Sequence, residues 1–137
     1  MAVKKKRKPK TRTENKFRGA IVSYMRKSFA MYSPKYGEIR KRCRVEVPKP
    51  KKGGGFCKVP DVWHRCEQCG ELTKKLDVDH KDPIIPIGMS YSDMTLDEIY
   101  NRLNCDINNL WGLCKDTCHH NKTMGERLER EKAKKAK

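Results

Sequence analysis

The sequence predicts a small α+β domain in which two short strands and a helix follow an N-terminal helix, with basic segments as tails. Apolar residues recur at helical intervals before residue 31 and after residue 95, and they alternate or cluster in two short runs at 72–79 and 110–113. Paired cysteines accompany these two runs, and such pairs bind zinc in a reducing compartment. One tetrahedral Zn²⁺ is therefore expected to hold the halves of the domain together. The four cysteines are Cys66, Cys69, Cys114 and Cys118.

The charge of the chain favours nucleic acid as its partner. Its 137 residues include 33 Lys and Arg against 17 Asp and Glu, which gives a formal net charge of +16. The positive residues recur along the whole chain and do not gather in one membrane-facing patch, so nucleic acid is the expected anion. The hydrophobic fraction of 36% is low for one small domain, so a structural metal would help to close its core.

The expected location is the cytoplasm. The charged segment Met1–Lys8 is not followed by an apolar run, so it does not have the pattern of a secretory signal. No apolar segment is long enough to span a bilayer, and no membrane partner is expected.

One helix is expected near the N-terminus. Residues 1–13 are rich in Lys and Arg and are expected to form a disordered basic arm, which is either a phosphate contact or a solvated tail. Thr11-Arg12-Thr13-Glu14 has the spacing of a capping box and predicts a helix over 14–31, ended by Ser33-Pro34. Its residues at helical spacing are Phe17, Ile21, Tyr24, Ser28 and Met31.

Residues 14–55 are interpreted as this N-terminal helix and a basic connecting segment. Within the connection, the stretch 40–47 ends in a strand-like alternation, and 48–55 is a flexible stretch of Pro, Lys and Gly. Such a stretch is either disordered or lies over nucleic acid.

Residues 56–134 are interpreted as the functional domain. A strand is expected over 72–79, and a second capping box at Thr95 predicts a short helix that ends near Asn104. A second strand follows at 110–113. The sequence after Cys118 is helical in character to about residue 134, with Met124 and Leu128 expected to face inward.

The motifs of this domain run from Cys66 to Thr123 and resemble those of the HNH endonuclease family, the zinc-containing form of the ββα-metal nucleases. They are similar to those of small phage-encoded members, for which the cytoplasm would be that of the host cell. The second cysteine pair is separated by three residues, where the family usually has two. Both His119 and His120 are therefore candidates for the site, and the Cys-His-X-X-Lys-Thr spacing favours His119. The motifs are Cys66-X-X-Cys69, Asp79-His80-X-X-Pro83, Asn109-Leu110, Cys114 and Cys118-His119-X-X-Lys122-Thr123.

The resemblance implies a metal-dependent DNA endonuclease. Asp79 and His119 would hold a divalent cation, Mg²⁺ or Mn²⁺, with Ni²⁺ and Zn²⁺ as further candidates. His80 would act as the general base for the attacking water. Asn109 would hydrogen-bond the backbone after His80 and fix the angle of its imidazole. Lys122 would contact a phosphate, although a surface lysine on a helix would look the same. The four cysteines would hold a structural zinc.

Hydrolysis by such a site would leave 5′-phosphate and 3′-hydroxyl ends. One site cuts one strand at a time, so nicking of double-stranded DNA is expected, with a dimer or a phage packaging protein as candidate partners. The alternative is a catalytically inactive, zinc-stabilised nucleic-acid-binding module. That module, like a ribosome-associated zinc-ribbon protein, explains the charge and the cysteines but gives no role to Asp79, His80, Asn109 and His119.

Overall fold

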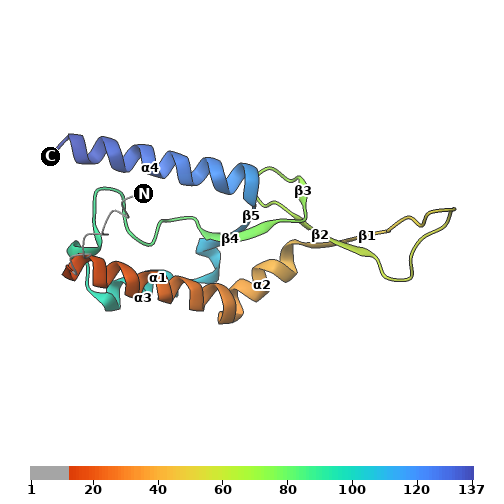
Figure 1. The fold of residues 1–137 in the computed structure, drawn as a ribbon, viewed down its shortest axis with the longest axis horizontal. Helices are drawn as coiled ribbons and strands as arrows, with labels where there is room; N and C mark the ends of the chain where they lie inside the picture. The colour runs from red at the N-terminus through yellow and green to blue at the C-terminus, as the bar shows by residue number, and fades with distance from the viewer. Residues whose placement is uncertain (1–12) are drawn as a thin grey trace, which may run out of the picture.

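The structure, a computed structural model, describes residues 13–137 (Figure 1). The expected disordered arm lies outside the described residues except for Thr13. The mixed α+β fold is confirmed. Among the described helices, none combines the length and the apolar character that crossing a membrane requires. The elements in chain order are the helices α1 (Glu14–Tyr32) and α2 (Pro34–Cys43), the strands β1 (Arg44–Val47), β2 (Asp61–Arg65), β3 (Leu72–Thr73) and β4 (Leu76–His80), the 3₁₀ turn η1 (Tyr91–Asp93), the helix α3 (Leu96–Leu103), the 3₁₀ turn η2 (Ile107–Asn109), the strand β5 (Leu110–Cys114), the π-helical turn η3 (Lys115–His119) and the helix α4 (His120–Lys135).

The N-terminal part contains two helices where the sequence predicted one. The cap of α1 is Thr13, whose hydroxyl accepts a hydrogen bond from the backbone N–H of Lys16, whereas Thr11, where the capping box was predicted, lies outside the described residues. The predicted stop at Ser33-Pro34 is confirmed, but Pro34 also starts α2. Proline suits this position because its fixed φ matches the first helical turn. It has no backbone N–H, and an N–H at this position would have no acceptor within the helix.

Helix α1 does not bury the stripe that its spacing suggested. Phe17, Tyr24 and Met31 are exposed, whereas Val22 is only 1% exposed and Phe29 packs beside it. Neighbouring residues on a helix point about 100° apart, so a shift of one residue changes which face is buried. The buried face is set by the segments that pack against the helix. The core on that side also contains Ile84, Ile85, Met94, Ile99 and Leu103.

The strands form two separate sheets. Sheet order in the first is β1–β2–β3, and β1 and β2 form a hairpin that extends away from the body of the molecule (Figure 1). The second is the antiparallel pair β4–β5, in which Asp79 faces Trp111 and His80 faces Leu110. The single strand expected over 72–79 is therefore two strands, since β3 pairs with β2 and β4 pairs with β5.

Helix α2 packs against the β4–β5 pair and completes a second core cluster. Tyr36, Ile39 and Cys43 are buried there together with Leu110. Helix α2 lies close to β5 at Gly112, where an added Cβ would lie 2.6 Å from the Sγ atom of Cys43. The pair β4–β5 is thereby held from one side by a helix that the sequence did not predict.

Helix α4 follows β5 and has no buried residue. Met124 and Leu128 are 40% and 54% exposed, so the prediction that they face inward is wrong. Polar contacts hold the helix instead, because the guanidinium of Arg130 donates to the carbonyl oxygens of Ile85 and Pro86 in the long connection after β4. A helix attached by charged side chains leaves room between itself and the rest of the molecule.

Candidate metal centre and active site

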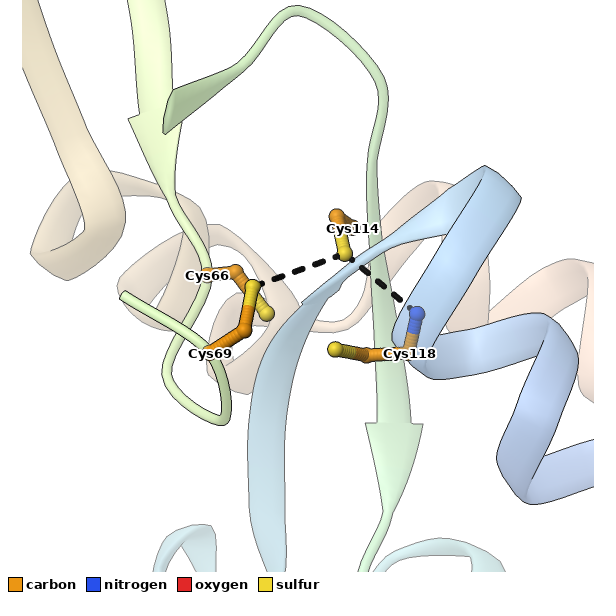
Figure 2. Close-up of side chains that lie close together, drawn as sticks. All are labelled: Cys66, Cys69, Cys114 and Cys118. Atoms are coloured by element: carbon orange, nitrogen blue, oxygen red, sulfur yellow. Dashed lines mark hydrogen bonds between the residues drawn. The ribbon is translucent and has the colours of Figure 1, made fainter. Parts of the chain in front are cut away.

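Four cysteine side chains converge between the turn after β2 and the end of β5 (Figure 2). Their Sγ atoms all lie within 4.8 Å of one another, and those of Cys69 and Cys114 are 3.9 Å apart. A tetrahedral Zn²⁺ with Zn–S bonds of about 2.3 Å separates its sulfurs by roughly 3.8 Å. All four thiols are free. The arrangement thus fits one closed, tetrahedral structural metal site, as predicted from Cys66, Cys69, Cys114 and Cys118.

The first cysteine pair is positioned by a tight turn. Gly70 has a φ of 78°, a left-handed conformation that favours glycine, and its N–H donates to the carbonyl oxygen of Cys66. The turn is tied to β5 through Glu67, whose N–H donates to the carbonyl of Gly112 and whose carboxylate accepts from the N–H of Gly112 at 2.6 Å. Arg42 of α2 forms an ion pair with the same carboxylate at 2.6 Å.

The second cysteine pair is positioned by the π-helical turn η3. The backbone N–H of Cys118 donates to the Sγ atom of Cys114 at 3.3 Å. A π-helical turn contains more residues than an α-helical one, so it accommodates three residues between the cysteines and still brings both sulfurs to one point. The wider spacing therefore leaves the geometry of the metal site intact.

The thiols of the cluster differ in how readily they lose a proton. Burial raises the pKa of the Cys66 thiol, but hydrogen bonds from the backbone N–H groups of Cys69 and Cys114 outweigh it and lower that pKa to about 6. Burial and the neighbouring thiols raise the pKa of Cys118 to about 12. Four thiolates so close together would repel one another, so all four would lose their protons only around a cation such as Zn²⁺.

A cavity of about 1030 Å³ lies between α1, β4, the long connection after it and α4. None of the four cysteines lines it. Four residues predicted for the active site do so, namely Asp79, His80, His119 and Lys122. The exposed His120 lines a second hollow beside Lys115, which His119 and Asp77 line as well, and His120 does not line the cavity. The structure thus places His119, and not His120, in the cavity with His80.

His80 is the buried imidazole of this site, with 3% of its surface exposed. Its Nε2 atom lies 2.9 Å from the carbonyl oxygen of Leu103, and the ring of Tyr36 packs edge-on against it at 6.2 Å between centroids. Burial lowers the pKa of His80 below its ordinary value of 6.5, opposed in part by the Leu103 carbonyl and the Asp79 carboxylate. The imidazole is therefore neutral near pH 7.

Asp79 and His119 each have a charged partner. The Nζ atom of Lys122 lies 2.9 Å from a carboxylate oxygen of Asp79 and also pairs with Glu126. The Nδ1 atom of His119 lies 3.0 Å from a carboxylate oxygen of Asp77. A carboxylate on Nδ1 orients a metal-binding imidazole and leaves Nε2 for the ion, as in other protein metal sites. Asp79 and His119 thus have the donor types that suit a divalent cation.

Asn109 makes the contact expected of it, although it does not line the cavity. Its side-chain oxygen accepts a hydrogen bond from the backbone N–H of Asp82 at 3.0 Å, and its carbonyl oxygen accepts one from the N–H of Lys81 at 2.7 Å. Both donors directly follow His80. Asn109 thus joins the end of β4 to the start of β5 beside the imidazole.

Sequence reasoning missed Tyr36, which lines the cavity from the unpredicted helix α2. Arg26, which also lines it, was predicted only as one of several charges on the polar side of the first helix. Asp77, which pairs with His119, lines the second hollow, and it was predicted only to share a strand face with Asp79. The one available signal was strand alternation, since Asp77 and Asp79 lie two residues apart on a strand and therefore point the same way. The cavity also has basic walls, formed by Arg26, Lys122, Arg127, Arg130, Lys134 and Lys137.

Comparisons with models of known protein families, with curated proteins and with solved structures found no match for this chain. The site is therefore interpreted from its own residues.

Proposed function

We propose that this protein is a metal-dependent endonuclease that nicks double-stranded DNA. The observation that carries the proposal is the convergence of Asp79, His80 and His119 on one cavity with basic walls, where β4 meets α4. A protein that only binds nucleic acid needs the basic walls but has no use for a carboxylate and two imidazoles in their midst. The resemblance to HNH endonucleases supports the same activity.

His80 acts as the general base. The carbonyl oxygen of Leu103 can only accept a hydrogen bond, so Nε2 of His80 carries the proton and donates it. Nδ1 then keeps its lone pair, and no described residue hydrogen-bonds it. An imidazole held in one tautomer is suited to taking a proton from the water that attacks the phosphorus, while the 3′-oxygen leaves.

Asp79 and Nε2 of His119 hold the divalent cation in this proposal. Such an ion, when bound, polarises the phosphoryl oxygen and stabilises the leaving oxygen. Mg²⁺ and Mn²⁺ suit the carboxylate, and Ni²⁺ or Zn²⁺ would suit the imidazole. Asp77 fixes the orientation of His119 through its Nδ1 atom.

Lys122 and the basic residues of α4 bind the DNA backbone. Lys122 already pairs with two carboxylates, and these outweigh its burial and raise its pKa, so it keeps its charge. Arg127 and Lys134 lie on the same wall of the cavity. Cationic side chains around a scissile phosphate neutralise the charge that develops in the transition state.

One chain contributes one such cavity, so we expect nicks with 5′-phosphate and 3′-hydroxyl ends. Cutting of both strands would require a second copy of the chain or a partner, for which a phage packaging protein is one candidate.

The test uses supercoiled plasmid at low salt. The wild-type protein should convert it to the open-circular form with Mg²⁺ or Mn²⁺ and not without added divalent cation. His80→Ala and His80→Gln should nick at least about 100-fold more slowly, the contribution typical of a general base. His64→Ala, which removes a half-buried imidazole on β2 outside the cavity, should nick like wild type. Circular dichroism checks that each variant folds. Binding without nicking under every cation would show that the proposal is wrong.

One observation favours a second function, a zinc-stabilised module that binds nucleic acid without cutting it. The ammonium group of Lys122 lies at the Asp79 carboxylate, where a catalytic cation would bind. Lys122→Met separates the two functions. A nuclease should still nick only when a divalent cation is present, but more slowly and with weaker DNA binding, because Lys122 also neutralises charge in the transition state. A binding module should show neither nicking nor a response to Mg²⁺.

A further inference from the structure

The hairpin formed by β1 and β2 continues past its strands as an arm, defined here as residues 48–60 (Figure 1). The two strands pair from Arg44 opposite His64 to Val47 opposite Asp61. Figure 1 shows the arm running out from the body of the molecule, on the side opposite the C-terminus. In this view no other helix or strand of the described chain lies beside its outer end.

The far end of the arm has a defined shape. Pro50 pairs with Phe56 as an isolated bridge. The N–H of Cys57 donates to the carbonyl of Lys49 at 2.8 Å, and the N–H of Lys51 donates to the carbonyl of Gly55 at 3.0 Å. Three glycines in left-handed conformation turn the chain, with φ values of 98°, 105° and 74° at residues 53, 54 and 55. The flexible connection expected at 48–55 is therefore a hydrogen-bonded turn.

The surface of the arm is apolar and positive. Phe56 is 65% exposed and Val59 is 75% exposed, although the backbone around them is fixed. Between residues 48 and 60 there is no Asp or Glu, and the carboxylates at the base of the arm, Glu46 and Asp61, pair with Arg44 and Lys74. The cations of the arm are Lys49, Lys51, Lys52 and Lys58.

We propose that this arm is a second contact surface for double-stranded DNA, which lies along a groove on one side of the cleavage site. The proposal rests on the proposed nuclease function and adds where the substrate extends beyond the cut. The major groove is about 12 Å wide and admits a two-stranded β-ribbon. The lysines would neutralise phosphates, and Phe56 would pack against the sugar and base edges at the groove.

The length of the arm sets how much DNA it covers. Residues 48–51 lead from the paired strands to the turn, and at about 3.3 Å each they extend roughly 13 Å. At about 3.4 Å per base pair, this corresponds to roughly four base pairs on one side of the cavity. An acidic protein would satisfy the lysines as well, but it would not require an ordered ribbon of these dimensions.

The experiment measures binding of a labelled duplex of about 30 base pairs by fluorescence anisotropy, with no added divalent cation and across a range of KCl concentrations. The arm variant carries Lys49→Gln, Lys51→Gln and Lys52→Gln, which keep the glycines and the backbone hydrogen bonds. The matched control carries Lys41→Gln, Lys75→Gln and Lys115→Gln, which remove the same charge from exposed residues off the arm and outside the cavity. A third variant is Phe56→Ala.

The arm variant should bind at least tenfold more weakly near 0.1 M salt, and the slope of log K against log salt should fall by about 2.7, or about 0.9 for each lost phosphate contact. Phe56→Ala should weaken binding and leave the slope unchanged. The wild-type footprint should extend roughly four base pairs further on one side than that of the arm variant.

Equal losses of DNA affinity in the arm variant and the control would contradict the proposal, because the net charge of the protein would then explain both losses. Tighter binding of single-stranded DNA, RNA or an acidic peptide than of the duplex would also contradict it. These outcomes are independent of the nuclease test. If wild type binds through the arm but never nicks plasmid, only the proposed activity fails.

Discussion

The Nε2 atom of His80 lies 2.9 Å from the main-chain carbonyl oxygen of Leu103, the last residue of α3. Helix α3 belongs to the long connection between β4 and β5, so this connection does more than join two strands. It supplies the acceptor that fixes the tautomer of the candidate general base. The capping box of α3, in which Thr95 and Glu98 exchange hydrogen bonds, helps to hold that acceptor in place.

Asn109 should act by positioning His80. Asn109→Ala removes the acceptor for the Asp82 N–H and should lower the free energy of unfolding by about 1 kcal/mol. It should also reduce the nicking rate at saturating protein and leave the affinity for DNA unchanged. Asn109→Asp keeps an acceptor oxygen and should restore most of the rate. Urea unfolding of both variants measures the fraction of folded protein. If the nicking rate falls only in proportion to that fraction, Asn109 contributes stability alone and does not position His80.

Gly112 should tolerate no larger residue. The Cβ of Gly112→Ala would lie 2.6 Å from the Sγ atom of Cys43, and such overpacking costs about 1–3 kcal/mol. Adding Cys43→Ala removes the clashing sulfur, so the double variant should lose less stability than the sum of the two single variants. Additive losses in urea unfolding would show that the two residues are not in contact.

Removal of a metal from the four-cysteine cluster should unfold the domain that contains β4 and β5. A metal bound there would join the turn at Cys66 to the turn at Cys118 through its four sulfur ligands, and binding energy at such sites is folding energy. Cys69→Ser should lower the zinc content, measured by mass spectrometry, below one ion per chain and abolish cooperative unfolding. Cys57→Ser, on the arm, is the control. A circular dichroism spectrum unchanged by strong chelator would contradict a structural role.

Tyr36 should make stability depend on alkaline pH. Burial, followed by the charge of Asp79, raises the pKa of Tyr36 from 10.0 to about 12. The unfolded chain releases this proton at lower pH than the folded chain. The contribution of Tyr36 to the free energy of unfolding is therefore complete below pH 10 and is lost as the pH rises towards 12. The loss should be at most about 1.4 kcal/mol per pH unit. Tyr36→Phe should flatten the stability curve between these pH values, and identical curves would contradict the assignment.

The sequence predicted the parts of the fold that local pattern determines. The cysteine spacing, the strand through Asp79 and the capping box at Thr95 each depend on residues a few positions apart, and the structure contains all three. The metal cluster was predictable because its chemistry requires cysteines and no other explanation fits two pairs.

What the sequence did not predict depends on contacts between distant segments. Helix α2 is short and polar on most of its surface, so Tyr36 gave no periodic signal before its contact with His80 was seen. The exposed stripe of α1 and the outward Met124 of α4 show the same limit, because spacing identifies a helix but not the face that packs. The order of the arm comes from backbone hydrogen bonds, which composition does not reveal.

The most direct test of the proposed nuclease compares two adjacent histidines. His119 lines the cavity and contacts Asp77, whereas His120 is exposed outside it. Both variants, His119→Ala and His120→Ala, are assayed for conversion of supercoiled plasmid to open circles with Mg²⁺ and Mn²⁺. We expect His120→Ala to nick like wild type and His119→Ala to lose at least about 100-fold, with unchanged zinc content and folding. Equal nicking by the two variants, or none by wild type with either ion, would contradict the proposed site.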